Sequence, residues 1–284
     1  MVTIIKTTPE LIDRRSRETG RVGFVPTMGN LHAGHISLLE QALTENDVVY
    51  FSIFVNPKQF GPKDDFSKYP RTLTDDVTHI QSCEAKYPGK NVIVFSPADP
   101  QEVFPLDYEQ TISVSPLNSL VEGAQRPGHF DGVTTVVYRL FELVKPLKAY
   151  FGLKDYQQYL VIKQMTKDLA LPVEIVGMPI EREPAGLALS SRNQYLSPEQ
   201  RTEGLVLIQS LRRIVGLIDK KRTNLRTAKR QIDILLLDTR WNYLEMRDAE
   251  TLSEDLTHSK SITLLGVYQI GTTRLLDNLQ LEIQ

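Results

Sequence analysis

The chain has 284 residues, a formal net charge of −2 and one cysteine, with 41% hydrophobic and 24% charged residues. This composition is typical of a globular protein of two domains and argues against a disordered chain. The balanced charge lacks the basic excess of a nucleic-acid-binding protein, and the lone cysteine excludes an intramolecular disulfide framework. Neither an apolar run long enough for a membrane span nor the apolar core of a signal peptide is present. We therefore expect a cytoplasmic protein with no nucleic-acid or membrane partner.

From residue 1 to about residue 180, short apolar runs alternate with segments of helical periodicity. We expect strands at residues 2–5, 22–25, 48–55, 91–95, 111–114, 148–151 and 173–180. We expect helices at residues 8–20, 35–45, 73–86, 133–144 and 155–169, the first of them capped by Thr8. This alternation predicts an α/β fold, a Rossmann-like parallel sheet with helices on both faces. The loops after Val25, Val55, Phe151 and Ile180 should then meet at one edge, where such sheets bind ligands.

The pattern changes after Tyr195. Ser197, Pro198 and Gln200 form a helix-start pattern, with serine as the cap and proline in the first position. We expect helices at residues 199–219 and 225–237, followed by strands at 242–247, 262–268 and 279–283. Helices followed by strands predict a smaller α+β domain. The sequence thus divides into domains at residues 1–184 and 185–284.

The segment FVPTMGNLHAGHISL, residues 24–38, contains two of the five histidines of the chain. A strand ends near Pro26, a turn with Gly29 follows, and His32 and His35 stand where helical periodicity begins. A helix amino terminus offers unpaired N–H groups and a positive dipole end, both of which suit phosphate. The pattern favours phosphate binding. A helix cap with a partly buried histidine and a metal-binding pair stay open as alternatives.

The segment FGLKDYQQ, residues 151–158, follows a predicted strand. Lys154 offers a point charge for phosphate, and Asp155 can hold a ribose hydroxyl, a metal ion or the neighbouring lysine. Gln158 lies three residues further, on the same helix face as Asp155. The alternative is a solvated helix start with a capping aspartate.

The segment GLALSSRNQYLS, residues 186–197, lies between the two predicted domains. Ser190 and Ser191 supply hydroxyl donors, and Arg192 supplies a planar donor fork, so the three together suit a triphosphate. The alternative is a polar linker. Its place between domains also suits an element that closes over a substrate.

Three further loops carry candidate residues. Gln59 follows a buried strand, where its amide can bind a hydroxyl or a carboxylate. Arg126 and His129 either bind an anion or lie in a surface loop. Asp75 and Asp76 suit the dipole of a helix start better than a metal ion. No serine or cysteine stands in a nucleophile elbow, which favours direct transfer between bound substrates.

Seven motifs together resemble the pantothenate synthetase (pantoate–β-alanine ligase) family: PTMGNLHAGH, SIFVNPKQF, YPRT, EGAQRPGHF, KDYQQ, LALSSRNQYL and GTTRLLDN. The resemblance runs in order from about residue 20 to residue 284. Its HxGH core is shared across the nucleotidyltransferase superfamily, whereas VNPxQF and LSSRN are more specific. The resemblance implies a ligase of pantothenate biosynthesis that joins (R)-pantoate to β-alanine through an enzyme-bound pantoyl adenylate. ATP is then a substrate, and AMP and pyrophosphate are products.

The resemblance also implies roles for individual residues. His35 would donate a proton to the phosphates or stabilise them, with help from His32, Lys154 and Arg192. Gln59 and Gln158 would hold pantoate, Gln59 also lying near β-alanine. The residues implied in ATP binding are Met28, Gly29, Asn30, Leu31, His32, Ala33, Gly34, His35, Gly152, Leu153, Lys154, Asp155, Glu181, Leu189, Ser190, Ser191 and Arg192. The family further implies a homodimer and Mg²⁺ with ATP, near Asp75 and Asp76.

Two positions depart from the family pattern. The family usually reads GEKD where this chain has GLKD, with Leu153. We expect a mild effect, because the backbone can make the nucleotide contact. His79 stands where relatives often have another polar residue, which bears on any set of protein ligands for Mg²⁺.

Two other functions stay open from the residues alone. One is a nucleotidyltransferase that adenylates a phosphorylated acceptor, which would leave Gln59 and Gln158 without a role. The other is a nucleotide-binding module without turnover. The intact His32, His35, Lys154 and Arg192 argue against it.

Overall fold

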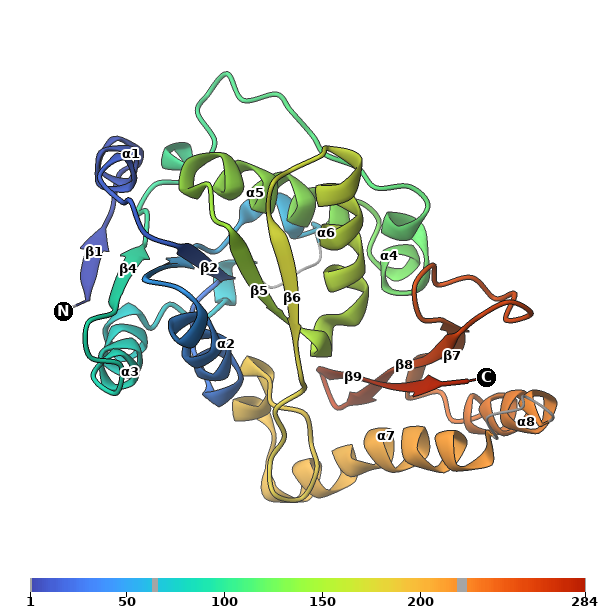
Figure 1. Cartoon of the computed structure of the whole chain (residues 1–284). Helices are drawn as coiled ribbons and strands as arrows, with labels where there is room; N and C mark the ends of the chain where they lie inside the picture. The colour runs from blue at the N-terminus through green and yellow to red at the C-terminus, as the bar shows by residue number, and fades with distance from the viewer. Residues whose placement is uncertain (1, 63–65, 219–223, 284) are drawn as a thin grey trace. The chain divides into compact units, whose positions relative to one another are not determined.

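The computed structural model describes residues 2–62, 66–218 and 224–283. Contacts divide the chain into two compact units. Unit 1 comprises Met1–Leu153 and Gln157–Pro179, and unit 2 comprises Lys154–Tyr156 and Ile180–Gln284 (Figure 1). The domain boundary that we place at 184/185 from the sequence stays a prediction. None of the described helices is long and apolar enough to cross a membrane.

The described residues of unit 1 form a six-stranded parallel sheet in the order β1-β4-β3-β2-β5-β6. The strands are β1 (Thr3–Ile5), β2 (Val22–Thr27), β3 (Val48–Ile53), β4 (Asn91–Phe95), β5 (Lys148–Gly152) and β6 (Glu174–Met178). The continuous apolar run that begins at Val48 forms β3, whose first five residues are buried. Such runs belong to strands covered on both faces. The predicted parallel sheet is confirmed.

Helices cover both faces of this sheet (Figure 1). They are α1 (Thr8–Ser16), α2 (Ala33–Glu45), α3 (Leu73–Glu84), α4 (Val121–Gln125), α5 (His129–Val144) and α6 (Tyr156–Asp168). Side chains of α2 and α3 share a core with Val25 and Phe51 of the strands. On the opposite face, Phe141 of α5 packs edge-on against Phe24, with ring centroids 6.1 Å apart. Short 3₁₀ helices lie at η1 (Pro57–Gln59), η2 (Phe66–Lys68), η3 (Pro100–Glu102), η4 (Leu117–Ser119), η5 (Leu153–Asp155) and η6 (Ser191–Tyr195).

The described part of unit 2 contains three antiparallel strands in the order β7-β8-β9. They are β7 (Trp241–Asp248), β8 (Ser261–Ile270) and β9 (Thr273–Glu282), and they follow the helices α7 (Pro198–Leu217) and α8 (Leu225–Leu235). Ser197 and Gln200 form a capping box at the start of α7. Apolar side chains of both helices, including Leu211 and Ile232, form one core with the strands. The predicted helices followed by strands are confirmed.

The strand predicted at residues 111–114 is wrong, because this segment pairs with a helix and not with a strand. The Ile112 N–H donates to Thr135 Oγ1 at 3.0 Å, and Thr134 Oγ1 donates to the Ile112 carbonyl at 2.5 Å. Two hydroxyls of α5 thus satisfy the backbone groups that a sheet would have paired.

The ends of several elements also differ from the prediction. Thr7, and not Thr8, caps α1, its side chain accepting the Glu10 N–H. β2 continues through Pro26, where it pairs with β3 alone, because its ladder with β5 ends at Phe24. The predicted helix end at Asp219 lies outside the described residues.

Candidate functional site

The carboxyl ends of the parallel strands share one edge of unit 1. β2 and β5 are neighbours in the sheet although β3 and β4 lie between them in the sequence, so the strand order reverses at this pair. Open α/β sheets bind ligands at such a switch point. The chain leaves β2 into the turn that begins at Met28, and it leaves β5 at Gly152. The first and third of the predicted polar loops therefore start at the switch point.

The turn after β2 is held by a carboxylate from a distant helix. Gly29 and Asn30 both have positive φ values, 82° and 53°. Asp76, in the first turn of α3, is 1% exposed, and its two carboxylate oxygens accept the N–H groups of Asn30 (3.1 Å) and Leu31 (2.8 Å). Thr72 Oγ1 also donates to Asp76 at 3.2 Å. These bonds fix a backbone bend that glycine adopts more easily than other residues.

His32 and His35 form a capping box at the start of α2. The Gly34 N–H donates to Nδ1 of His32 at 3.1 Å, and the His32 N–H donates to Nδ1 of His35 at 3.3 Å. The two ring centroids are 4.1 Å apart. A neutral imidazole whose Nδ1 accepts carries its proton on Nε2. The backbone therefore sets both neutral rings in the tautomer whose Nε2–H can donate to an anion.

The helix start differs in one respect from the expectation drawn from sequence. The sequence predicts unpaired backbone N–H groups that suit phosphate, but those of Gly29, Asn30, Leu31, His32, Gly34 and His35 donate to Thr27, to Asp76 or within the turn. The imidazole rings and the positive end of the α2 dipole are thus the groups that can favour an anion here.

Gln59 lies beside the turn. Its carboxamide Nε2 is 3.1 Å from the sulfur of Met28, and its Oε1 accepts from Asn56 Nδ2 at 3.0 Å. The bond from Asn56 orients the amide, so that its N–H groups face the turn. Gln59 is 9% exposed, and buried polar atoms of this kind need hydrogen-bond partners. The structure therefore brings together Met28 and Gln59, which the sequence placed in separate loops.

Three residues outside the predicted ATP- and pantoate-binding sets hold Gln59 in place. Asn56 Nδ2 also donates to the Gly132 carbonyl at 3.0 Å, and a Cβ on Gly132 would lie 2.2 Å from the Lys58 carbonyl oxygen. His129 Nδ1 is 2.8 Å from the Gln59 carbonyl oxygen. The anion-binding alternative for His129 thus gives way to a contact that positions η1. The Asn-Pro pair after the buried strand was the available signal for Asn56.

The two glutamines of α6 differ in surroundings. Gln157 is buried, donates to the carbonyls of Leu117 and Leu120 at 2.7 Å and accepts the Glu122 N–H at 3.0 Å. It holds the segment before α4. Gln158, the predicted pantoate residue, is half-buried.

The candidate residues Lys154, Asp155, Glu181 and 189–192 belong to unit 2. Lys154 Nζ is 3.5 Å from a carboxylate oxygen of Asp155, so these two neighbours form an ion pair. Ser190 Oγ accepts the Arg192 N–H at 3.3 Å and caps η6. The side chains of Ser190, Ser191 and Arg192 are half-buried. The Glu181 carbonyl accepts the Leu189 N–H at 2.9 Å, so the backbone at both positions belongs to one hairpin-like loop.

Comparisons with known proteins agree in one family. The family model described as pantoate-beta-alanine ligase matches residues 1–280. A pantothenate synthetase from Roseiflexus sp. is 45% identical over 98% of this chain and 99% of its own length. The chain belongs to the pantoate–β-alanine ligase family.

Solved structures of this ligase family extend the match to three dimensions. The Thermus thermophilus enzyme superposes with a TM-score of 0.86 at 42% identity, over 98% of this chain and 99% of that chain. A ligase from Francisella tularensis, complexed with beta-gamma ATP and beta-alanine, superposes with a TM-score of 0.72 at 33% identity, over 98% and 97%.

Leu153 departs from the usual sequence of the ligase family in a packed position. A Cβ added to Gly177 of β6 would lie 2.7 Å from a methyl group of Leu153, so the leucine side chain rests on the sheet at a site without a side chain. A glutamate there would place a carboxylate against the same surface. The leucine therefore contributes packing where the GEKD pattern implied by the resemblance would place a charge.

The described residues do not assemble a protein-held metal site. No group of three or more His, Cys, Asp or Glu side chains suited to a metal ion occurs among them. Asp76 is buried and already accepts two N–H groups, while Asp75 and His79 are exposed. Of these two aspartates, Asp75 is thus the one that solvent reaches.

Proposed function

We propose that this chain catalyses the ATP-dependent condensation of (R)-pantoate with β-alanine to pantothenate, AMP and pyrophosphate. The contact between Gln59 and Met28 carries this proposal, because it places an oriented amide beside the turn that leads into the histidine pair. Such an amide can hold a hydroxy acid next to a nucleotide phosphate. Membership in the ligase family supports the same reaction.

The proposed reaction has two steps and no covalent bond to the enzyme. The pantoate carboxylate attacks the α-phosphorus of ATP, and the bond from that phosphorus to the bridging oxygen breaks to release pyrophosphate. The amine of β-alanine then attacks the acyl carbon of pantoyl adenylate, AMP leaves, and the amine releases its proton to solvent. A carboxylate is ionised at neutral pH, so the first step needs no general base. Catalysis then consists of positioning and charge stabilisation.

Within this proposal the residues have separate roles. His35, assisted by His32, donates from Nε2 to the phosphates, and Lys154 and Arg192 add positive charge. Gln59 and Gln158 hold pantoate. ATP is bound by three segments, at Met28–His35, Gly152–Asp155 and Leu189–Arg192, with Glu181 contributing backbone.

We further propose that Mg²⁺ enters bound to ATP, where it would neutralise phosphate charge. Asp75 would contact the water molecules bound to the ion, whereas Asp76 would keep its hydrogen bonds to the turn after β2. We also propose a cytoplasmic homodimer of the nucleotidyltransferase superfamily. The HxGH turn supports the superfamily, and the lone cysteine suits a reducing compartment. Light scattering during size-exclusion chromatography measures the subunit number, and a monomer at assay concentration would contradict the homodimer.

A substrate-omission assay tests the proposed reaction. AMP should appear only when ATP, pantoate and β-alanine are all present, whereas pyrophosphate should form in a single turnover without β-alanine. AMP release that does not depend on β-alanine would reject the ligase. Pyrophosphate release with a phosphorylated acceptor and no amine would instead indicate a nucleotidyltransferase of another specificity.

A further inference from the structure

The strand β9 contains two adjacent buried polar residues that the proposed reaction does not use. Asp277 is 3% exposed and Asn278 is 2% exposed. Burying a carboxylate or an amide is costly unless its polar atoms are bonded. Both belong to the sequence GTTRLLDN. Their partners therefore indicate why polar residues interrupt this strand.

Asp277 holds the loop that leads to Ser190. Arg182 donates to both carboxylate oxygens of Asp277, from Nη1 at 2.6 Å and from Nη2 at 2.9 Å. The same Nη1 donates to the Gly186 carbonyl at 3.0 Å, and Arg182 pairs with Ala188 across the loop. Planar two-point pairing of this kind fixes geometry as well as charge. The bend that precedes Ser190 is thus fixed to β9 through Arg182.

Asn278 holds the other phosphate-binding segment of unit 2. Its Nδ2 donates to the Lys154 carbonyl at 2.9 Å. Successive side chains of a strand point to opposite faces of the sheet. Leu275, two residues before Asp277, packs in the core with α7, so Asp277 lies on that face and Asn278 on the other. One strand thereby anchors a different segment on each of its faces.

We propose that Asp277 and Asn278 are positioning residues, which set Lys154 and the Ser190–Arg192 segment at a fixed separation for the phosphates of one ATP. The inference rests on the proposed function, because both segments are assigned to ATP there. In this proposal both residues act through Arg182 and Lys154 and not by contact with substrate. A displacement of about 1 Å in a positioned group can lower a rate about 100-fold. Substitutions on β9 that move Lys154 or the Ser190–Arg192 segment slightly should therefore weaken the binding and reaction of ATP.

Two variants and a control separate positioning from stability. Asn278→Ala removes one side-chain hydrogen bond, and Arg182→Met with Asp277→Leu replaces the ion pair by apolar side chains, a change that often preserves stability. Asp238→Asn is the control, since Asp238 also lies in unit 2 and accepts from Tyr268 (2.9 Å) and Arg240, away from both segments.

Calorimetric titration with a non-hydrolysable ATP analogue, together with KM values for all three substrates, gives the readout. We expect the Kd of the analogue and the KM for ATP to rise about tenfold or more in both variants, with the KM for pantoate and β-alanine within about twofold of wild type. The control should keep wild-type nucleotide affinity even where its melting temperature falls.

Wild-type Kd for the analogue in both folded variants would overturn the inference, as would an equal rise in the control. If the double variant does not fold, the Kd measured for Asn278→Ala decides the test by itself. Absence of β-alanine-dependent AMP release from the wild-type chain would reject the proposed function, while the titration would still decide whether β9 positions an ATP site.

Discussion

In the proposed reaction His35 has two roles, one on each nitrogen atom of its ring. Its Nδ1 accepts the His32 N–H and helps to begin α2, which leaves the proton of the neutral ring on Nε2. His35→Gln can keep the cap, because glutamine fills this position in capping boxes, and it retains an N–H donor. His35→Ala removes both functions. Comparing the two variants therefore separates the helix cap from the chemistry.

We expect His35→Ala to lower kcat by about 10²–10³-fold, because it removes a donor to the phosphates, and His35→Gln to lose less. AMP release under saturating substrates measures kcat, and far-UV circular dichroism checks that α2 persists. A His35→Ala enzyme with near-normal kcat would remove His35 from the mechanism.

Asp75 and Asp76 should respond differently to the loss of charge. Asp76→Asn presents an amide to two backbone N–H groups, only one of which it can satisfy, so we expect a loss of about 1–3 kcal/mol in the free energy of unfolding and a higher KM for ATP. Asp75→Asn should lose much less stability, since it gives up only the interaction of an exposed charge with the dipole of α3, and it should shift the Mg²⁺ dependence of the rate. Urea unfolding and Mg²⁺ titrations of AMP release measure these effects. Equal behaviour of the two variants would contradict the assignment.

The residues of the site were easier to predict than the contacts that hold them. The sequence singles out His32, His35 and Gln59 because each follows a strand of a parallel sheet and carries a suitable polar group, and their roles in the site stay predictions. Asp76 and Leu31 are 45 positions apart in the sequence. An aspartate in the first turn of a helix is already explained by the helix dipole, so the sequence gives no reason to look for a distant partner. Long-range partners of backbone groups leave no periodic signal in the sequence.

At the scale of elements, strands and helices were predictable where side-chain periodicity set them. β4 spans the predicted residues 91–95, because a bounded apolar run has few alternatives. Residues 111–114 alternate as a strand would, yet Thr134 and Thr135 capture their backbone. The alternation can be read from the sequence, but the hydrogen bonds from distant threonine hydroxyls, which replace those of a sheet, cannot.

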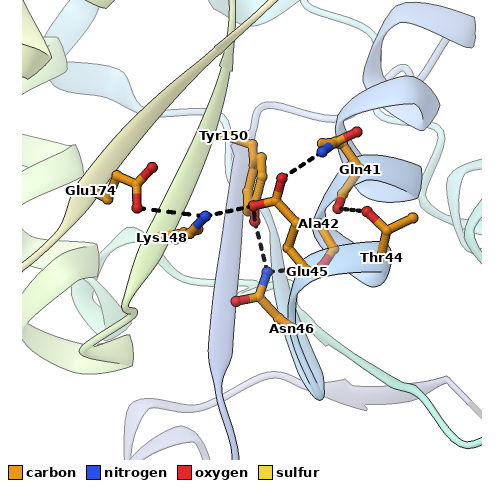
Figure 2. Close-up of polar contacts among 8 residues, drawn as sticks. All are labelled: Gln41, Ala42, Thr44, Glu45, Asn46, Lys148, Tyr150 and Glu174. Atoms are coloured by element: carbon orange, nitrogen blue, oxygen red, sulfur yellow. Dashed lines mark hydrogen bonds and ion pairs between the residues drawn. The ribbon is translucent and has the colours of Figure 1, made fainter.

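A polar cluster joins the end of α2 to the start of β5, at the strand ends opposite the site (Figure 2). Glu45 accepts from Lys148 Nζ at 2.8 Å and from Tyr150 Oη at 2.9 Å. Asn46 Nδ2 donates to Tyr150 Oη at 2.8 Å. The other ends of these elements carry the histidine pair and Gly152, so the cluster helps to set their alignment.

The hydrogen bond from Lys148, followed by that from Gln41, lowers the pKa of Glu45 below its usual 4.5. A lowered folded-state pKa means that Glu45 contributes stability above about pH 4.5 and loses it as pH falls through the folded pKa. We expect Glu45→Gln to reduce the free energy of unfolding by about 1 kcal/mol or less at pH 7, since the pair is partly exposed, and by less near pH 3. Urea unfolding at several pH values measures this. A constant difference from pH 7 to about pH 3 would contradict the role of the charge.

At the scale of the whole molecule, the chain crosses between its two units more than once. Lys154–Tyr156 belongs by its contacts to unit 2, although β5 and α6 on either side belong to unit 1. Tyr156 Oη donates to the Ala249 carbonyl at 2.7 Å, and Asn278 holds the Lys154 carbonyl. The order of Lys154, which we propose to bind phosphate, therefore depends on β9 and on the residue that follows β7. Nothing in the sequence FGLKDYQQ predicts that three of its residues make their contacts with unit 2, while the residues on either side belong to unit 1.

Tyr156→Phe tests this dependence, because it keeps the ring and leaves the buried Ala249 carbonyl without its hydroxyl donor. We expect unit 2 to lose about 1–3 kcal/mol and ATP affinity to fall with it. The only tryptophan of the chain, Trp241, is buried in β7 and packs 4.9 Å from the Tyr268 ring, so its fluorescence reports the unfolding of unit 2. Hydrogen exchange in peptides of β2 and β3 reports unit 1 separately. Tyr159→Phe on the same helix is the matched control and should leave the tryptophan transition unchanged. An unshifted transition in Tyr156→Phe, or an equal shift in the control, would contradict the role of the Tyr156 hydroxyl in unit 2.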